Sequence, residues 1–415
     1  MKKLLFIPLI IMKLCAIDYE ITGFGTLGGA ISDSKDEFLR FIDNKGTIKS
    51  NSVFGLQTDT SFTEHWGMTL QGKVESSIKN DKDWDPIISW AFLSYRPTND
   101  WLFRLGKFRL PLYLNSQNID VGVTYNMSML PIEVYKFSPS NDGVGLDIVK
   151  TFSFENSELS VESFYANTVT NYRFYVRDDL SSYGGLNNGA NFHEIEIDSK
   201  GIVITYELDN SDKFRLGYYR ATGKNSNGQG SFANSFSLQP ISYIPGMYAY
   251  QPDGGLKVES DTVAITLGME LNFQDNYKLT AEYAYKNMIH FDSAPNMHTG
   301  YVSLSKKIDD WDNFITFGIA KSEDNVKEAY KDLYTDPFNN IVASNRQYAD
   351  SMQVFDQKSY SLGTAYSLTS KSKIKAQWTY IQTGDISNYL FDNDNKTISQ
   401  EESLNIFSLS YNFVF

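Results

Sequence analysis

The sequence predicts an all-β fold: a transmembrane antiparallel β-barrel of about 16 strands with short periplasmic turns and long extracellular loops. The first observation behind this is the C-terminus, where one residue in two is apolar. The apolar residues are Phe407, Leu409, Tyr411, Phe413 and Phe415, and the small polar residues between them are Ser408, Ser410 and Asn412. Because successive strand side chains point to opposite faces, this segment has one apolar and one polar face. Lipid outside and water inside a barrel require this arrangement. A sandwich strand packed on a core is the alternative.

The second observation is the N-terminus, which predicts a secretory signal peptide over residues 1–16. Lys2 and Lys3 precede a short apolar run, and residues 14–16 form an acceptable site for signal-peptide cleavage after Ala16. The run is too short to span a bilayer. The only cysteine, Cys15, leaves with the signal. A lipoprotein would keep Cys15, but residues 12–14 lack the small side chains that such processing needs. We expect residues 17–415 to form the barrel, without disulfides.

Composition fits a barrel better than a soluble domain. Mean hydropathy is negative, as expected when only alternate strand residues face lipid. Aromatic residues make up 15% of the chain, which suits two interfacial girdles, or alternatively an aromatic-rich sandwich or carbohydrate-binding module. Removing Lys2, Lys3 and Lys13 lowers Lys and Arg from 37 to 34 against 50 Asp and Glu, so the mature net charge is about −16. This argues against nucleic acid as a partner and suits a cell surface where divalent cations bridge carboxylates and lipid phosphates.

The same alternation recurs along the chain. It covers residues 66–75, 262–273, 279–286, 315–319 and 374–380. Glu270 lies in the middle of one such apolar strand, where a charge is tolerated only if it faces a wet lumen.

The third observation is that short and long connections alternate. Short turns rich in Asn, Asp, Ser and Pro are expected at 63–65, 97–100, 155–158, 210–212, 274–276, 309–312 and 370–371. Longer polar segments lie near 31–51, 79–85, 110–142, 177–198, 225–258, 324–355 and 385–400, and an eighth segment on the same side, near 291–297, is shorter. These breaks give about 16 strands, enough for an aqueous channel rather than a filled core. No repeat of fixed period indicates a propeller or solenoid.

Several segments resemble the general porins of Gram-negative bacteria, most strongly over residues 17–150. They are Ile21–Ala30, Trp90–Pro97, Arg104–Leu114, Val121–Tyr125 and Pro131–Tyr135. The resemblance implies a homotrimer in the outer membrane, in contact with lipid and lipopolysaccharide, that lets small hydrophilic solutes and ions diffuse passively. It also implies that the third loop, residues 111–142, folds inward to narrow the pore. The terminal aromatic residues resemble the signal read by the barrel-insertion machinery, here Tyr411, Phe413 and Phe415.

The resemblance also implies a charged pore constriction. Its wall bases would be Arg104, Lys107 and Arg109, and its loop acids Asp120 and Glu133, with Asp142 at the end of the loop. Such rings of charge set selectivity in pores. The alternation that places Leu105 toward lipid would carry Lys107 and Arg109 outward unless a bulge intervenes. The alternative is that these are solvated surface charges. The acidic excess predicts a modest preference for cations.

The other motifs in the sequence are weaker evidence of function. The G-x-G-x-x-G pattern at 23–28 lacks the preceding strand of a dinucleotide-binding unit, so we expect its glycines to allow close approach of a neighbour. The acid-rich segments 81–85 and 392–395 lack the EF-hand pattern, and the histidines show no metal spacing. We therefore expect no metal, no cofactor and no enzymatic activity. A substrate-selective channel and a surface adhesion or structural barrel remain alternatives.

Overall fold

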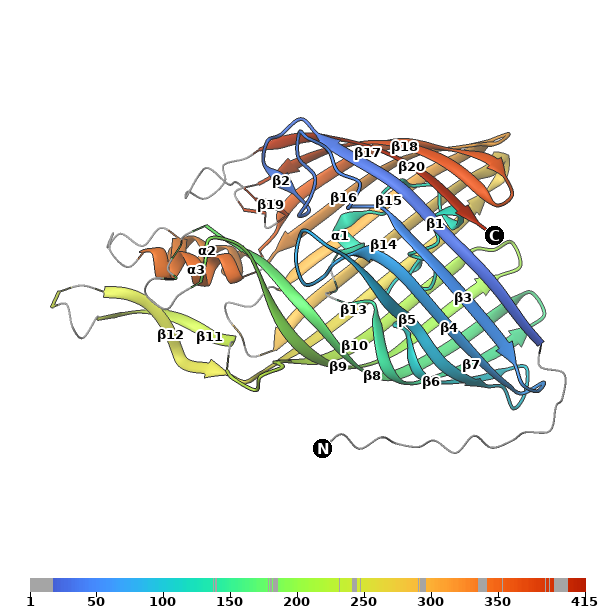
Figure 1. Cartoon of the computed structure of the whole chain (residues 1–415), viewed down its shortest axis with the longest axis horizontal. Helices are drawn as coiled ribbons and strands as arrows, with labels where there is room; N and C mark the ends of the chain where they lie inside the picture. Colours follow the sequence, from blue (N-terminus) through green and yellow to red (C-terminus); the bar gives the residue numbers. More distant parts are fainter. Residues whose placement is uncertain are drawn as a thin grey trace.

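In the computed structural model, sixteen strands pair antiparallel all the way around, and the first pairs with the last, so the sheet closes on itself (Figure 1). This confirms the expected fold class. The structure describes residues 18–136, 138, 140–177, 179, 181, 186–230, 232–240, 245–246, 248–289, 291, 296–334, 342–352, 354–384, 386–387, 389–391 and 402–415. The expected signal peptide, residues 1–16, and the acid-rich segment 392–395 lie outside these ranges. The signal peptide stays a prediction.

The barrel strands follow in chain order. They are β1 (Asp18–Ser32), β3 (Val53–Ser61), β4 (Trp66–Ser76), β5 (Trp84–Tyr95), β6 (Trp101–Arg109), β7 (Asp142–Phe154), β8 (Ser157–Val176), β9 (Gly189–Leu208), β10 (Lys213–Asn225), β13 (Glu259–Phe273), β14 (Tyr277–Ile289), β15 (Met297–Ile308), β16 (Trp311–Ser322), β17 (Asp356–Thr369), β18 (Ser372–Thr383) and β20 (Ser403–Val414).

The two faces of the wall differ in chemistry as the alternation predicts. In β20, Phe407 and Leu409 are exposed on the outer face at 55% and 60%, while Ser408, Ser410 and Asn412 are buried on the inner face. Glu270 points inward, and its Oε1 lies 2.8 Å from the ammonium of Lys278. The wall is therefore apolar toward lipid and polar toward the lumen.

The connections separate into a turn end and a loop end of the barrel. The seven turns cover 62–65, 96–100, 155–156, 209–212, 274–276, 309–310 and 370–371, with the 3-10 helix η3 (Gln274–Asn276) in one of them. The eight longer connections all lie at the opposite end. The expected numbers of short turns and long loops are both confirmed.

One long loop is shorter than expected. The segment 177–198 reads as polar, but β9 already begins at Gly189, so residues 189–198 pair with the end of β8. Both strands have 20 residues. A strand that rises beyond the lipid can carry polar side chains on both faces, which removes the alternation that marks a membrane strand.

Four other connections contain secondary structure that their polarity concealed. The segment 225–258 forms the hairpin β11 (Phe232–Pro240) and β12 (Tyr248–Lys257), and 324–355 contains α2 (Asp324–Tyr334) and α3 (Val342–Ser351). Phe236 and Tyr250 of the hairpin pack against the apolar cluster of the two helices. The short strands β2 (Glu37–Phe38) and β19 (Leu390–Phe391) pair with each other. Of the helices in the described ranges, none has the length and apolar character to cross a membrane.

The acid-rich segment 81–85 is tied down rather than simply solvated. The carboxylate of Asp81 accepts hydrogen bonds from Arg40 and from the guanidinium of Arg173, the latter at 2.8 Å. These contacts join the connection 77–83 to the first loop and to β8.

The barrel closes by fitting aromatic rings over glycines. The backbone N–H of Gly23 donates to Phe415 O and that of Phe415 donates to Gly23 O, both at 3.0 Å. A Cβ at Gly23 would lie 2.2 Å from the ring of Phe415, and one at Gly25 would lie 2.5 Å from the ring of Phe413. The glycines of the 23–28 pattern therefore lie in a strand, and the neighbour that approaches two of them is the C-terminal strand of the same chain.

We predict that Gly23→Ala weakens closure, because the added methyl displaces the Phe415 ring from the seam. Gly29→Ala is the matched control in the same strand, since its Cβ would meet Thr47 O at an ordinary 3.6 Å. The measurement is the fraction of heat-modifiable, folded barrel after refolding in detergent. Equal folded fractions for the two variants would contradict this account of the seam.

Candidate functional site in the lumen

The third long loop, residues 110–141, lies inside the barrel and contacts walls on opposite sides. From β18, the ammonium of Lys375 donates to the carbonyls of Gly122 and Met127 at 2.6 and 2.9 Å. From β10, the hydroxyl of Tyr219 donates to Pro111 O at 2.9 Å. The loop contains the 3-10 helix η1 (Gly122–Thr124) and the short helix α1 (Ile132–Tyr135). It crosses the lumen as expected, although its role in narrowing a pore stays a prediction.

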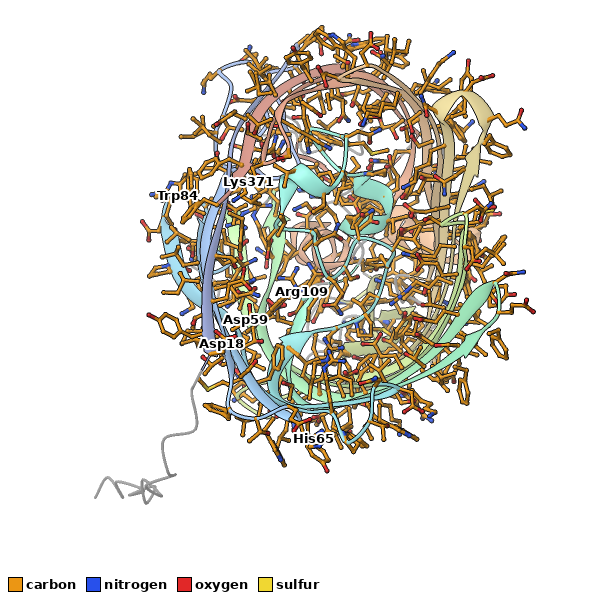
Figure 2. All side chains as sticks on the ribbon, turned by 90° about the vertical axis from the view of Figure 1, so that its right-hand side faces the viewer. Asp18, Asp59, His65, Trp84, Arg109 and Lys371 are labelled. Carbon is orange, nitrogen blue, oxygen red and sulfur yellow. The ribbon has the colours of Figure 1, made fainter. Side chains whose placement is uncertain are left out.

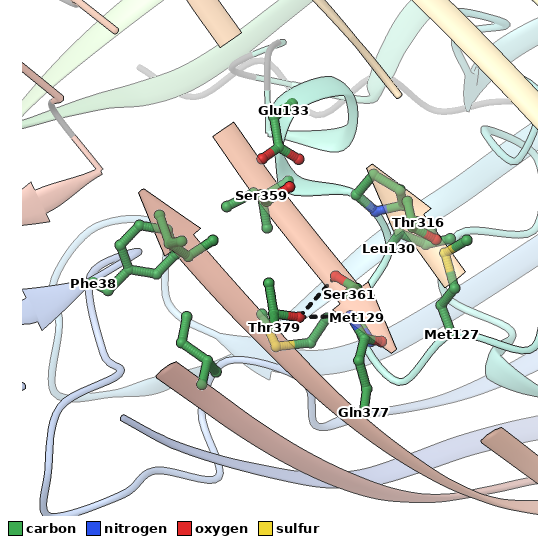
Figure 3. Close-up of a pocket in the computed structure, with 14 residues that line it drawn as sticks. Phe38, Met127, Met129, Leu130, Glu133, Thr316, Ser359, Ser361, Gln377 and Thr379 are labelled. Atoms are coloured by element: carbon green, nitrogen blue, oxygen red, sulfur yellow. Dashed lines mark hydrogen bonds between the residues drawn. The ribbon is translucent and has the colours of Figure 1, made fainter. Parts of the chain in front are cut away.

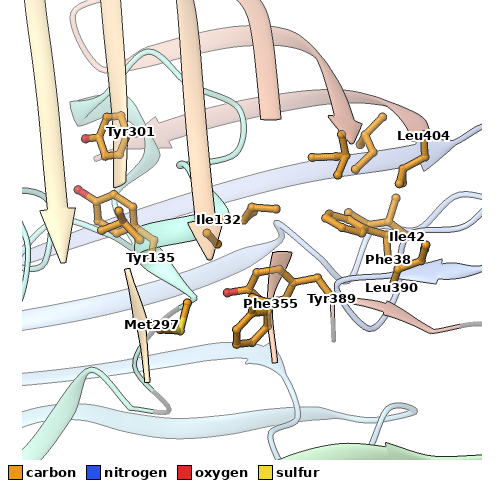
Figure 4. Close-up of a cluster of buried hydrophobic side chains, with 14 of the residues drawn as sticks. Phe38, Ile42, Ile132, Tyr135, Met297, Tyr301, Phe355, Tyr389, Leu390 and Leu404 are labelled. Carbon is orange, nitrogen blue, oxygen red and sulfur yellow. The ribbon is translucent and has the colours of Figure 1, made fainter. Parts of the chain in front are cut away.

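An apolar core seals one side of the loop against the wall. Ile132, Val134 and Tyr135 of α1 belong to a buried cluster (Figure 4). Its other members come from β1, from strands between β14 and β20, from the third loop itself, from the first and last long loops and from the connection 323–355. They include Phe38, Ile42, Met297, Tyr301, Phe355, Ile381, Tyr389 and Leu404. Hydrophilic solutes do not cross such a core, so it closes the lumen along β14 to β20 at this level. A second, smaller apolar cluster, which includes Phe108, Leu110, Phe164 and Tyr219, holds the start of the loop against β8 to β10.

Glu133 lies in this sealed side, which corrects the expectation that it faces the pore. Its side chain is only 1% exposed, and it lies beside Ser359 on β17 (Figure 3). Gln357 Nε2 donates to its Oε1 at 3.4 Å, and Thr299 Oγ1 donates to its backbone carbonyl at 2.5 Å. The cavity beside it has a volume of about 20 Å³, room for about one water. Glu133 therefore anchors the loop to β15 and β17.

Arg109 is the centre of the ion pairs on the other side. It is 2% exposed and lies within the ring of strands (Figure 2). Its Nη2 lies 2.7 Å from Asp120 Oδ2, and its Nε donates to Asp142. Lys73 on β4 lies 2.9 Å from the same Asp120 oxygen and 3.0 Å from Glu75. The expected meeting of Arg109 with loop acids is thus present, as ion pairs rather than as charges facing each other across open water.

Lys107 does not join this cluster. It pairs directly with Val144, which is 57% exposed on the outer face, and cross-strand partners share a face. The alternation ends after Lys107, because the side chains of both Phe108 and Arg109 are buried where β6 leaves the wall. The strand contains Gly106 at φ +134°, a conformation that L side chains rarely adopt.

Arg104 faces the lumen but pairs with wall acids instead of loop acids. Its Nε lies 2.7 Å from Asp147 and its Nη2 lies 2.8 Å from Glu162. It therefore belongs to a separate ion-pair group on β6, β7 and β8.

The pKa values of the charged groups in the loop are shifted in different directions. Burial raises the pKa of Asp120, but Arg109 and Lys73 outweigh burial and hold that pKa below its ordinary value. Burial raises the pKa of Glu133, and hydrogen bonds from Ser359 and Gln357 offset this only in part. Desolvation by the protein around it also lowers the pKa of Lys136, although its side chain is accessible to water, and Glu75 partly opposes this shift.

Several lumen residues escaped the sequence reasoning. Lys73 and Glu75 alternate with apolar residues in the segment 66–75. If the apolar residues of that strand face lipid, both charged side chains face the lumen, so the sequence could have placed them there. Lys375 carries the same signal in 374–380, and its ammonium lies 4.0 Å from the ring centre of Tyr125 in the loop. The wall carboxylate Glu282 accepts hydrogen bonds from Leu114 N at 3.0 Å and from the Tyr135 hydroxyl at 2.8 Å. Within the described residues, no group of three or more His, Cys, Asp or Glu could hold a metal.

The terminal residues Tyr411, Phe413 and Phe415 lie on the outer face of β20, with their rings stacked in sequence. This agrees with the alternation that singled them out. Their function as an assembly signal stays a prediction.

No protein-family model matches the sequence, and no curated protein matches it either. Solved structures do match. The outer membrane channel DcaP of Acinetobacter baumannii matches with a TM-score of 0.52 at 13% identity, over 96% of this chain and 97% of that one. This chain has the porin fold. An anion-selective porin from Comamonas acidovorans matches at 0.51 with 12% identity, over 96% of this chain and 100% of that one. The trimer form of OmpT, an outer membrane protein of Vibrio cholerae, matches at 0.51 with 10% identity, over 97% and 100%. At these identities the likeness concerns the fold.

We predict that Glu133 makes stability depend on pH. A carboxyl whose pKa is raised by folding contributes its stability fully below the ordinary value of 4.5. That contribution is lost as pH rises through the folded pKa. Glu133→Gln keeps the shape without the titration, so its thermal midpoint in detergent should fall less than that of the wild type as pH rises above about 4.5.

Glu64→Gln, in an exposed turn at the opposite end, is the control and should follow the wild-type curve. Parallel pH curves for wild type and Glu133→Gln would contradict the burial of an unpaired carboxyl at this position.

Proposed function

We propose that this protein is a porin of the outer membrane of a Gram-negative bacterium, a water-filled channel for passive diffusion of small hydrophilic solutes and ions. The observation that carries this is a 16-stranded barrel with a polar inner wall and a loop docked inside it. At that strand number, a barrel encloses more space than its wall side chains fill. Passive transport needs no reaction or cofactor, so the proposal includes no enzymatic activity.

The chemistry of the inner wall supports diffusion of polar solutes. Along β3 and β4, on the side that the apolar core leaves open, hydroxyl, amide and carboxylate groups face inward. They include the pairs Thr69 with Asp59 at 2.6 Å and Gln71 with Gln57 at 2.7 Å. Other parts of the inner wall carry ion pairs, such as Arg104 with Asp147 and Lys278 with Glu270. Groups of this kind hydrate readily and replace part of the hydration of a passing solute.

A second candidate function lies in the loops. The cluster formed by α2 and α3 with the β11–β12 hairpin is an apolar core outside the barrel wall, so these loops have a fixed surface that could bind a partner. An adhesion or structural barrel would use that surface and would not need an open lumen.

Measurements of ion conductance distinguish the porin function from the loop-borne function. We predict that the purified protein forms ohmic, water-filled channels in planar bilayers at neutral pH. Deleting residues 232–257, which form the hairpin outside the wall, should leave channel formation intact. Folded protein that inserts without any conductance would refute the porin proposal and favour the loop-borne function.

We also propose a homotrimer, as the trimer form of one structural neighbour suggests. Light scattering in several mild detergents should give three times the mass of one chain after subtraction of bound detergent. A monomer in all of them would remove this part of the proposal.

A further inference from the structure

The loop that crosses the lumen has few charges of its own. Residues 111–142 contain the acids Asp120, Glu133 and Asp142 and one base, Lys136. Sequence reasoning assigned the ion preference to the acids. The structure engages each of them: Asp120 with Arg109 and Lys73, Asp142 with Arg109, and Glu133 within the apolar side of the loop.

Lys136 differs from all three. Its backbone N–H ends α1 by donating to Ile132 O, and its side chain is exposed. Among the described residues, no carboxylate lies within ion-pair distance of its ammonium. The charges that act on it are Glu75, Arg40, Lys73 and Asp120.

The positions of these neighbours show which side of the lumen Lys136 faces. Lys73 and Glu75 are on the inner face of β4, Asp120 is in the loop, and Arg40 is in the first long loop. All lie away from the apolar core on β14 to β20. Lys136 therefore faces the side of the lumen that the core leaves to water.

We propose that Lys136 sets the ion preference of the channel and biases its constriction toward anions. This rests on the proposed channel function. Protein walls of low dielectric focus the field of an exposed charge along a narrow water path, whereas paired acids act there only as short-range dipoles. The acidic excess of the chain acts from farther away, and salt screens it over about 10 Å at 0.1 M.

The test is the reversal potential of single channels under a salt gradient. Lys136→Glu should lower the anion-to-cation permeability ratio by about twofold or more, and Lys136→Gln should give a smaller shift in the same direction. The matched control is Lys82→Glu. It makes the same change of charge at an exposed lysine in the connection 77–83, at the loop end, and should shift the ratio much less. Heat-modifiability confirms that each variant is folded.

Equal shifts for Lys136→Glu and Lys82→Glu, or no shift for either, would overturn the inference while the channel itself still conducts. A wild-type protein that folds and inserts but never conducts would overturn the proposed function and the inference together. A larger shift for Asp120→Asn than for Lys136→Gln would return selectivity to the acids and would also overturn the inference.

Discussion

The rest of the structure depends on one constraint: a sheet in lipid has to pair every backbone N–H and C=O group with itself. Hydrocarbon offers no alternative partner, and each unpaired group costs several kcal/mol. Every strand pairs with two neighbours only because β1 joins β20 and closes the sheet. The tight fit of Phe413 and Phe415 over glycines at this seam is therefore a condition for the whole wall. Side-chain alternation, lumen chemistry and loop placement all follow once the wall is closed.

Inside the closed wall, the loop is held by two kinds of contact that respond differently to their surroundings. The apolar core around Ile132 and Tyr135 depends on excluding water. The ion pairs of Arg109 depend on mutual compensation, since removing the guanidinium would leave Asp120 and Asp142 short of a partner at a cost of about 3–5 kcal/mol. The loop therefore has a dry side and a charged side, and this asymmetry leaves Lys136 as its exposed charge.

Sequence patterns predicted the wall well, because a period of two and the chemistry of tight turns are local properties. They missed the start of β9, where the strand stands above the lipid and no longer alternates. They could not place Glu133, because a loop has no period that tells its dry side from its wet side. Lys107 shows the value of side-chain alternation. It lies two residues after the outward-facing Leu105, which predicts an outward side chain, and its pairing with Val144 agrees. The resemblance to porins, taken without this alternation, had placed Lys107 in the pore.

The seam also decides how assembly of the chain can fail. β1 and β20 are the first and last strands of the barrel in chain order, so a partial sheet has an unpaired edge until these two strands meet. An unpaired strand edge is a template for pairing with other chains. Closure at the seam therefore protects the sheet from aggregation as well as from lipid.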